Sequence, residues 1–226
     1  MRDRYRGDMT APLSVHIWSD IACPWCFLGK RRFEEGVRRY GGDVEVEYHA
    51  FELSPDTPVD FEGSEADFLA AHKGMPRAQA EQMLAQMTEL AATEGLRYDF
   101  AALRHTRTLL AHQAIHHAKA NGRQEAMVER LFRAYFEEGR HVGRADDLAE
   151  LAGEVGLDGD ELRRALAGSA YAEAVAEDIA TARHIGINGV PFYVIDGRFG
   201  VSGAQPSDLF SSALARAAAP EQEQAG

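Results

Sequence analysis

Cysteine is nearly absent from this sequence, which contains two in 226 residues, Cys23 and Cys26. Two cysteines cannot form the framework of several disulfides that holds small secreted domains together. A structural disulfide is also difficult to maintain in a reducing cytosol. A close pair of this kind is more typical of catalysis or of metal binding, so its position in the chain is the first functional clue.

Long apolar runs are missing as well. No stretch approaches the roughly 18 unbroken apolar residues that suggest a membrane-spanning helix. The charged start MRDRYRGDMTAPL is not followed by the apolar run of a secretory signal. We therefore expect a cytoplasmic protein without a membrane partner.

Basic residues are fewer than acidic ones: 24 Lys and Arg stand against 36 Asp and Glu, which gives a formal net charge of −12. Such a chain repels a phosphate backbone, and no dense basic patch offsets this repulsion. The short cluster Lys30–Arg32 is interpreted as a solvated helix face. Nucleic acid is therefore not expected as a partner, and the acidic surface is compatible with a monomer or a homodimer.

The hydrophobic pattern predicts an α/β protein whose small sheet is interrupted by helices. The expected order is strand 14–19, helix 24–40, strand 44–51, several helices between residues 64 and 168, helix 170–184, strands 192–195 and 198–202, and a last helix from Pro206 to about residue 218. Ser64 is the expected N-cap of the first inserted helix. The first two strands, joined by a helix, are expected to be parallel.

This order predicts two structural units. Residues 13–60 and 169–218 form a discontinuous unit that contains the sheet, and residues 61–168 form an all-helical insertion. Residues 1–12 and 219–226 are expected to be flexible termini.

Cys23, Pro24, Trp25 and Cys26 lie between the first predicted strand and the first predicted helix. The unpaired N–H groups and the dipole of the helix favour a thiolate at Cys23, so its sulfur is expected to be nucleophilic and accessible. Cys26, one turn later, can attack a mixed disulfide formed at Cys23. A CxxC in this context is typical of a redox pair. The alternatives are an inert buried pair and half of a zinc site, although no second CxxC is present.

Four segments together resemble the DsbA-like branch of the thioredoxin superfamily and, within it, the FrnE-like oxidoreductases. They are SDIACPWCFLGKRRFE, YHAFELSPD, LLAHQAIHHAKANG and GINGVPFYVIDGRFGVSGAQP. The resemblance, over about residues 13–215, implies a thioredoxin fold with an inserted helical domain, a redox pair at Cys23 and Cys26, and a cis bond between Val190 and Pro191. In that family the proline packs against the cysteines, and the backbone before it can pair with a bound peptide.

The function expected from the motif and the resemblance is thiol–disulfide exchange. The expected site residues are Cys23, Cys26 and Pro191 in catalysis, and Pro24, Trp25 and Val190 along the substrate groove. The redox-active disulfide is the expected working group, no bound organic cofactor or metal is expected, and glutathione is a candidate co-substrate. The expected partners are protein or small-molecule thiols and disulfides.

Two other functions stay open. Relatives similar to hydroxychromene-carboxylate isomerase and kappa-class glutathione transferase usually carry serine at the position of Cys23 and use glutathione. A glutathione-dependent isomerase or transferase acting on a small aromatic or polyketide-like substrate is therefore one alternative. A non-enzymatic holdase with a client groove between the two units is the other. Cysteine at both positions favours disulfide exchange.

Four further polar residues are candidates for function. Asp20 lies three residues before Cys23 and is a candidate proton relay, although a turn or capping carboxylate is the commoner role. His112 and His116 have the i, i+4 spacing of a metal-binding pair, but no acidic or thiol partner with matching spacing is evident in the sequence. A helix face or groove lining is therefore preferred for both, and His49 is expected to be a packed residue of the second strand.

Overall fold

The computed structural model describes residues 12–219 and has the expected α/β thioredoxin-like architecture with a helical insertion. The termini expected to be flexible lie outside these residues, apart from residues 12 and 219. The elements are, in order, β1 (Leu13–Ser19), α1 (Pro24–Tyr40), β2 (Val44–Ala50), α2 (Glu65–Lys73), α3 (Arg77–Thr93), α4 (Leu109–Ala120), α5 (Gln124–Phe136), α6 (Ala145–Glu154), α7 (Gly159–Ala167), α8 (Ala172–His184), β3 (Phe192–Ile195), β4 (Phe199–Ser202) and α9 (Ser207–Ala218).

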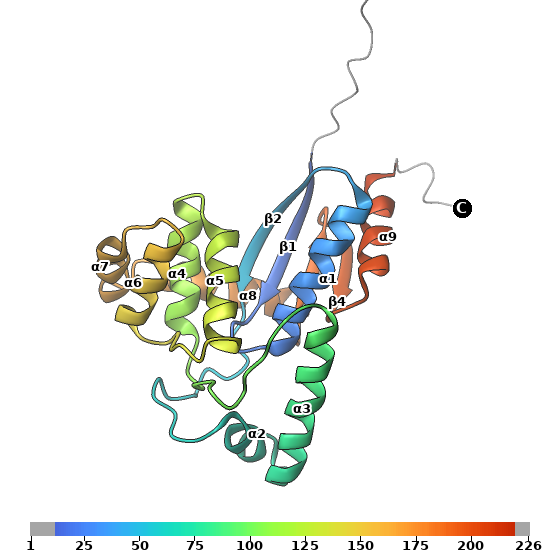
Figure 1. Ribbon diagram of the computed structural model, residues 1–226. Helices are drawn as coiled ribbons and strands as arrows, with labels where there is room; N and C mark the ends of the chain where they lie inside the picture. The colour runs from blue at the N-terminus through green and yellow to red at the C-terminus, as the bar shows by residue number, and fades with distance from the viewer. Residues whose placement is uncertain (1–11, 220–226) are drawn as a thin grey trace, which may run out of the picture.

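The sheet has the strand order β2-β1-β3-β4. β1 and β2 are parallel, as predicted, and β3 is antiparallel to both of its neighbours. Along the β1–β2 pair, His16 lies opposite Glu47 and Trp18 lies opposite His49, so these four side chains share one face of the sheet. α9 contacts β1 and β3 and also packs on α1, while α8 contacts β2. Figure 1 shows α4–α7 beyond β2, with α1 and α9 on the other side of the molecule and α2 and α3 extending below.

The helix starts follow the local sequence signals. Pro24 is the first residue of α1, where proline loses no hydrogen bond, and Cys23 is the N-cap with φ −91° and ψ 111°. Gly41 ends α1 in the left-handed conformation, with φ +74°. Ser64 caps α2 as predicted: its Oγ accepts a hydrogen bond from the Asp67 N–H, and the Asp67 carboxylate accepts one from the Ser64 N–H.

The sheet and the insertion share one hydrophobic core. Phe27 of α1 is fully buried and stacks on Phe132 of α5, with ring centroids 5.0 Å apart. The inserted helices therefore support the helix that carries both cysteines. The division into units at 13–60, 61–168 and 169–218 stays a prediction.

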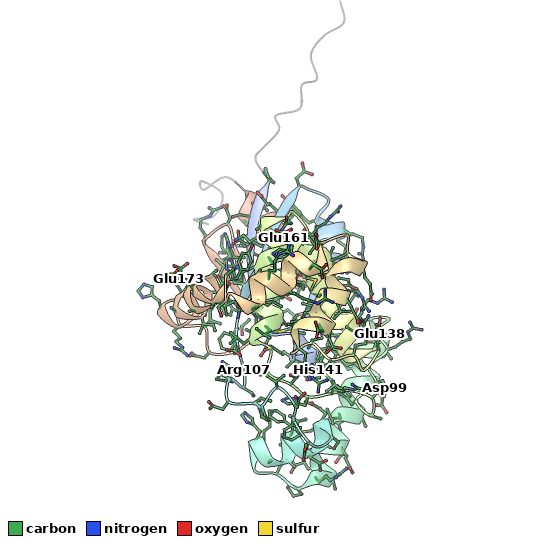
Figure 2. The ribbon with its side chains drawn as sticks, turned by 90° about the vertical axis from the view of Figure 1, so that its left-hand side faces the viewer. Asp99, Arg107, Glu138, His141, Glu161 and Glu173 are labelled. Atoms are coloured by element: carbon green, nitrogen blue, oxygen red, sulfur yellow. The ribbon has the colours of Figure 1, made fainter. Side chains whose placement is uncertain are left out.

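The segment between β2 and α2 is attached to the helical block, by which we mean α4–α7 and the loops that precede and join them. The Val59 carbonyl accepts hydrogen bonds from Thr106 Oγ1 at 2.7 Å and from His141 Nε2 at 3.0 Å. Arg107 forms an ion pair with Glu52, with 3.1 Å between Nε and Oε1. Figure 2 shows Arg107 and His141 along the boundary between the helical block and the α2–α3 pair. These contacts hold the segment before α2 against residues 106, 107 and 141.

The contact between α1 and α9 is expected to depend on Gly36. A Cβ atom at this position would lie 2.5 Å from Phe210 Cβ and 3.0 Å from the Ser207 carbonyl oxygen. Gly36→Ala is therefore expected to lower the free energy of unfolding by about 1–3 kcal/mol through overpacking. Urea unfolding followed by circular dichroism measures this change.

Gly153→Ala is the matched control, because a Cβ atom at this position in α6 meets no atom within 4 Å. Here alanine should leave stability unchanged or raise it by up to about 1 kcal/mol, since glycine is the weaker helix former. Equal effects of the two substitutions would contradict the close approach of α1 and α9.

Candidate active site at Cys23 and Cys26

Both cysteines lie at the start of α1, as the sequence predicted. The Cys23 N–H donates a hydrogen bond to the Asp20 carbonyl at 3.1 Å, and the Cys26 N–H donates to the Cys23 carbonyl at 3.0 Å. This compact turn places Cys23 before the first helical residue and Cys26 within the first turn. Both thiols are free in this structure.

The thiol of Cys26 is the more deeply enclosed of the two, with 2% of the residue exposed. Burial, a hydrogen bond with Cys23 and the charge of Cys23 together raise the pKa of Cys26 well above its usual value. The raised pKa means that Cys26 is held as a neutral thiol. It must lose its proton before it can attack another sulfur.

Cys23 is less exposed than the sequence suggested, because only 4% of the residue is accessible. Its Sγ lies 3.6 Å from the Val190 carbonyl oxygen and lines a cavity. Cys23 therefore borders a cavity rather than an open surface.

The cavity beside Cys23 has a volume of about 510 Å³. Pro24 and Trp25 line it, and Trp25 is 47% exposed, while their role along a substrate groove stays a prediction. The apolar side chains that α2 and α3 contribute to the lining are Phe68, Leu69, Met83, Leu84, Met87 and Leu90. No local pattern distinguished these residues, because apolar positions on a helix are also typical of core packing. Val190 and Pro191 are not among the residues that line this cavity.

The Val190–Pro191 peptide bond is cis, as the family resemblance implied. The Val190 carbonyl provides the contact with Cys23, while Pro191 approaches α1 at Gly29. A Cβ atom at Gly29 would lie 2.9 Å from Pro191 Cγ and 2.7 Å from Tyr193 Oη. Gly29 therefore permits this close approach. Sequence analysis missed its role, although a glycine inside a predicted helix was a usable signal.

Asp20 is buried behind the cysteine motif. Its carboxylate accepts hydrogen bonds from the Leu53 N–H at 2.8 Å, from Thr108 Oγ1 at 2.8 Å and from the Ala22 N–H at 3.2 Å, and His112 Nε2 lies 3.5 Å away. Burial raises the pKa of Asp20, but His112 and the hydrogen-bond donors outweigh burial, so the pKa lies below its usual range. The carboxylate caps the turn, and its use as a proton relay stays a prediction.

His49 and His116 share one carboxylate, that of Asp178 in α8. His49 Nδ1 lies 2.7 Å from Oδ1, His116 Nε2 lies 2.8 Å from Oδ2, and the Ala50 N–H donates to Oδ2 at 2.8 Å. Burial raises the pKa of Asp178, but these hydrogen bonds outweigh it and hold the pKa well below its usual range. Neither acidic partner was evident from the spacing of the two histidines: Asp20, in the turn before α1, lies near His112, and Asp178 of α8 lies near His116.

The fold and the site define a thioredoxin-fold protein with a helical insertion and a CxxC pair at the start of α1. A family comparison agrees with this class, because the model of the DSBA-like thioredoxin domain matches residues 14–215. The chain belongs to this family of oxidoreductases.

Three known proteins illustrate the relationship. The uncharacterized protein YwbO of Bacillus subtilis (strain 168) is 32% identical over 206 residues, which cover 89% of this chain and 96% of YwbO. The crystal structure of a probable DsbA oxidoreductase from Streptomyces coelicolor is 41% identical, with a TM-score of 0.84 over 91% of this chain and 89% of that chain. A structure of 2-hydroxychromene-2-carboxylate isomerase is 17% identical, with a TM-score of 0.70 over 94% of this chain and 100% of the other. The last likeness concerns the fold alone.

Within residues 12–219, no helix combines the length and the apolar character that crossing a bilayer requires.

Proposed function

We propose that this chain is a thiol–disulfide oxidoreductase of the FrnE-like branch, in which Cys23 reacts with the substrate and Cys26 resolves the product. The observation that carries the proposal is the unequal placement of two neighbouring buried thiols at the start of α1. Cys23 borders the cavity, whereas Cys26 lies behind it with a raised pKa. The position of Cys23 at the cavity suits a nucleophile that meets the substrate. The raised pKa of Cys26 suits a resolving residue that stays protonated until the mixed disulfide has formed.

The chemistry of the reducing direction follows from this arrangement. The Cys23 thiolate attacks one sulfur of a substrate disulfide, forms a mixed disulfide, and releases the other substrate sulfur as a thiolate that takes up a proton. Cys26 then loses its proton to solvent and attacks Cys23 Sγ. This step closes the Cys23–Cys26 disulfide and releases the second substrate thiol. Two electrons pass from the cysteine pair to the substrate, and the reverse sequence oxidises a dithiol.

The proposal gives roles to the residues around Cys23. Trp25 and Pro24 provide apolar contact for a substrate beside the sulfur. The carbonyl of Val190, 3.6 Å from Sγ, accepts a hydrogen bond from the thiol and orients it. Pro191 contributes through its packing on Gly29, which sets the distance between α1 and the segment that carries this carbonyl.

The cavity supports a second candidate function. A space of about 510 Å³ with an apolar lining falls in the size range of small-molecule sites. A glutathione-dependent isomerase or transferase with a small aromatic or polyketide-like substrate would use this space and would not need Cys26. We propose disulfide exchange first because a second thiol, Cys26, is present in the first turn of the same helix.

The proposal extends to partners and place of action. The partners would be protein or small-molecule thiols and disulfides, with glutathione as a co-substrate and the Cys23–Cys26 disulfide as the working redox group. A cytoplasmic location suits a pair that is reloaded by glutathione or by a thioredoxin-type partner.

A Cys26→Ser variant tests the proposal directly. The variant is treated with oxidised glutathione and, separately, with a peptide that contains one intramolecular disulfide. Without the resolving thiol, the mixed disulfide at Cys23 should persist, whereas the wild-type protein should release it. Intact-mass spectrometry measures the adduct.

The double variant Cys23→Ser/Cys26→Ser is the matched control and should form no adduct. Absence of any adduct on Cys26→Ser with either probe would contradict the resolving role. Retained isomerase or transferase turnover by Cys26→Ser, without an adduct, would instead favour the second candidate.

A further inference from the structure

A cluster of two histidines and a carboxylate lies on β1 and β2, outside the cysteine site. His16 Nδ1 lies 2.9 Å from His49 Nε2, and the same His49 atom lies 3.4 Å from Glu47 Oε1. The three ligand atoms all lie within 4.8 Å of one another. None of these residues lines the cavity beside Cys23. We propose that His16, Glu47 and His49 bind a divalent first-row transition-metal ion, with zinc as the ion of choice.

The distances in the cluster fit a metal site. Tetrahedral zinc with bonds of about 2.0–2.1 Å places its ligand atoms roughly 3.3 Å apart. The separations of 2.9 Å and 3.4 Å bracket this value. Two imidazoles and one carboxylate form a set of three protein ligands that leaves one position for water. The ion would replace the hydrogen bond between the two imidazoles.

His49 is already oriented for this role. Its Nδ1 is hydrogen-bonded to Asp178 Oδ1 at 2.7 Å, which directs Nε2 toward His16 and Glu47. A carboxylate behind a ligating histidine is a common arrangement, because it fixes the tautomer and the ring. Trp18 stacks on the His49 ring, with centroids 4.5 Å apart, so the ring cannot easily turn away.

The cluster can be reached from outside. His16 and Glu47 line a hollow of about 680 Å³ along β2, next to the segment 122–126. Lys119 lines the same hollow and forms an ion pair with Glu47 at 2.5 Å. The half-exposed Lys119 is therefore a competitor for the carboxylate that a metal ion must displace.

The test uses untagged Cys23→Ser/Cys26→Ser protein, so that neither thiolate can bind the ion. Isothermal titration with zinc chloride should show one ion per chain. His16→Ala and Glu47→Gln should each weaken binding at least about 10-fold. Lys119→Gln should tighten it, because it frees the Glu47 carboxylate, and His184→Ala, an exposed histidine of α8, should have no effect.

The fluorescence of Trp18 offers a second measurement, which reports whether the ion binds next to His49. In a Trp25→Phe background it is the only tryptophan of the chain, and its stacking on His49 should make cobalt(II) quench its fluorescence in proportion to occupancy. Glu47 is partly exposed, so Glu47→Gln should fold even if a histidine variant does not. The proposal is overturned if zinc does not bind stoichiometrically, or if folded Glu47→Gln binds zinc and is quenched by cobalt as the parent is.

Discussion

Cys23→Ser protein is expected to lose disulfide exchange, with the rate of insulin reduction lowered by about three orders of magnitude or more. A serine hydroxyl stays protonated at neutral pH and cannot form a mixed disulfide. Cys26 cannot take over, because it is buried and burial raises its pKa. The measurement is the initial rate of insulin precipitation above the rate with dithiothreitol alone.

The control for this variant is its thermal stability. Serine replaces one sulfur by oxygen and keeps a group that can donate to the Val190 carbonyl, which lies 3.6 Å from Cys23 Sγ. The melting temperature should therefore stay within about 3 °C of the wild-type value. A folded variant that keeps most of its activity would remove Cys23 from the mechanism.

The region from β1 to α1 was predictable because its signals are local. Alternating apolar residues mark the strand, Pro24 marks the first helical position and Gly41 marks the end of the helix. Each of these signals acts over a few residues, so the chain need not be folded for it to be recognised. The placement of Cys23 and Cys26 at the start of a helix follows from them, and the structure confirms it.

The surroundings of the cysteines were less predictable, because they come from distant segments. The low exposure of Cys23 and its 3.6 Å contact depend on Val190, which is 167 residues away. The apolar wall of the cavity comes from α2 and α3, where no local rule separates a residue that lines a cavity from one that fills a core. A motif predicts which atoms react, whereas the packing around it decides what can reach them.

The hydrogen bonds of the buried carboxylates of Asp20 and Asp178 could not be predicted from the sequence for the same reason. Asp178 is 129 residues from His49 and 62 residues from His116, and Thr108 is 88 residues from Asp20. Histidine spacing within one helix could not indicate carboxylates supplied by a turn and by α8. Such pairings form only when the fold excludes water from them.

These two carboxylates have a common structural role. Asp20 joins the turn before α1 to Thr108 at the start of α4, and Asp178 joins α8 to His116 in the same helix. Helix α4 is therefore attached at two buried points. Asp20 connects its start to the turn that precedes Cys23, and Asp178 connects its His116 to α8 and to His49 of β2. Loss of either carboxylate should weaken the packing of the inserted helices against the sheet and lower the free energy of unfolding.

Asp178→Ala is expected to cause the largest loss of stability, about 3 kcal/mol at pH 7. The substitution leaves His49 Nδ1, His116 Nε2 and the Ala50 N–H without their acceptor in a largely buried place. Urea unfolding of the variant and the wild-type protein at a series of pH values measures the difference. Glu173→Ala on the same helix is the matched control, since Glu173 is exposed (Figure 2) and should change stability little.

The pH dependence identifies the charge as the cause. The pKa of Asp178 is lower in the folded chain than its unfolded value of about 3.9. The stabilisation by the ionised carboxylate is therefore complete above about pH 4 and declines as the pH falls through the folded pKa. The stability gap between wild type and Asp178→Ala should narrow as the pH falls below about 4. A gap that stays the same down to pH 2 would show that packing, rather than the ionised carboxylate, holds α8 to α4 and β2.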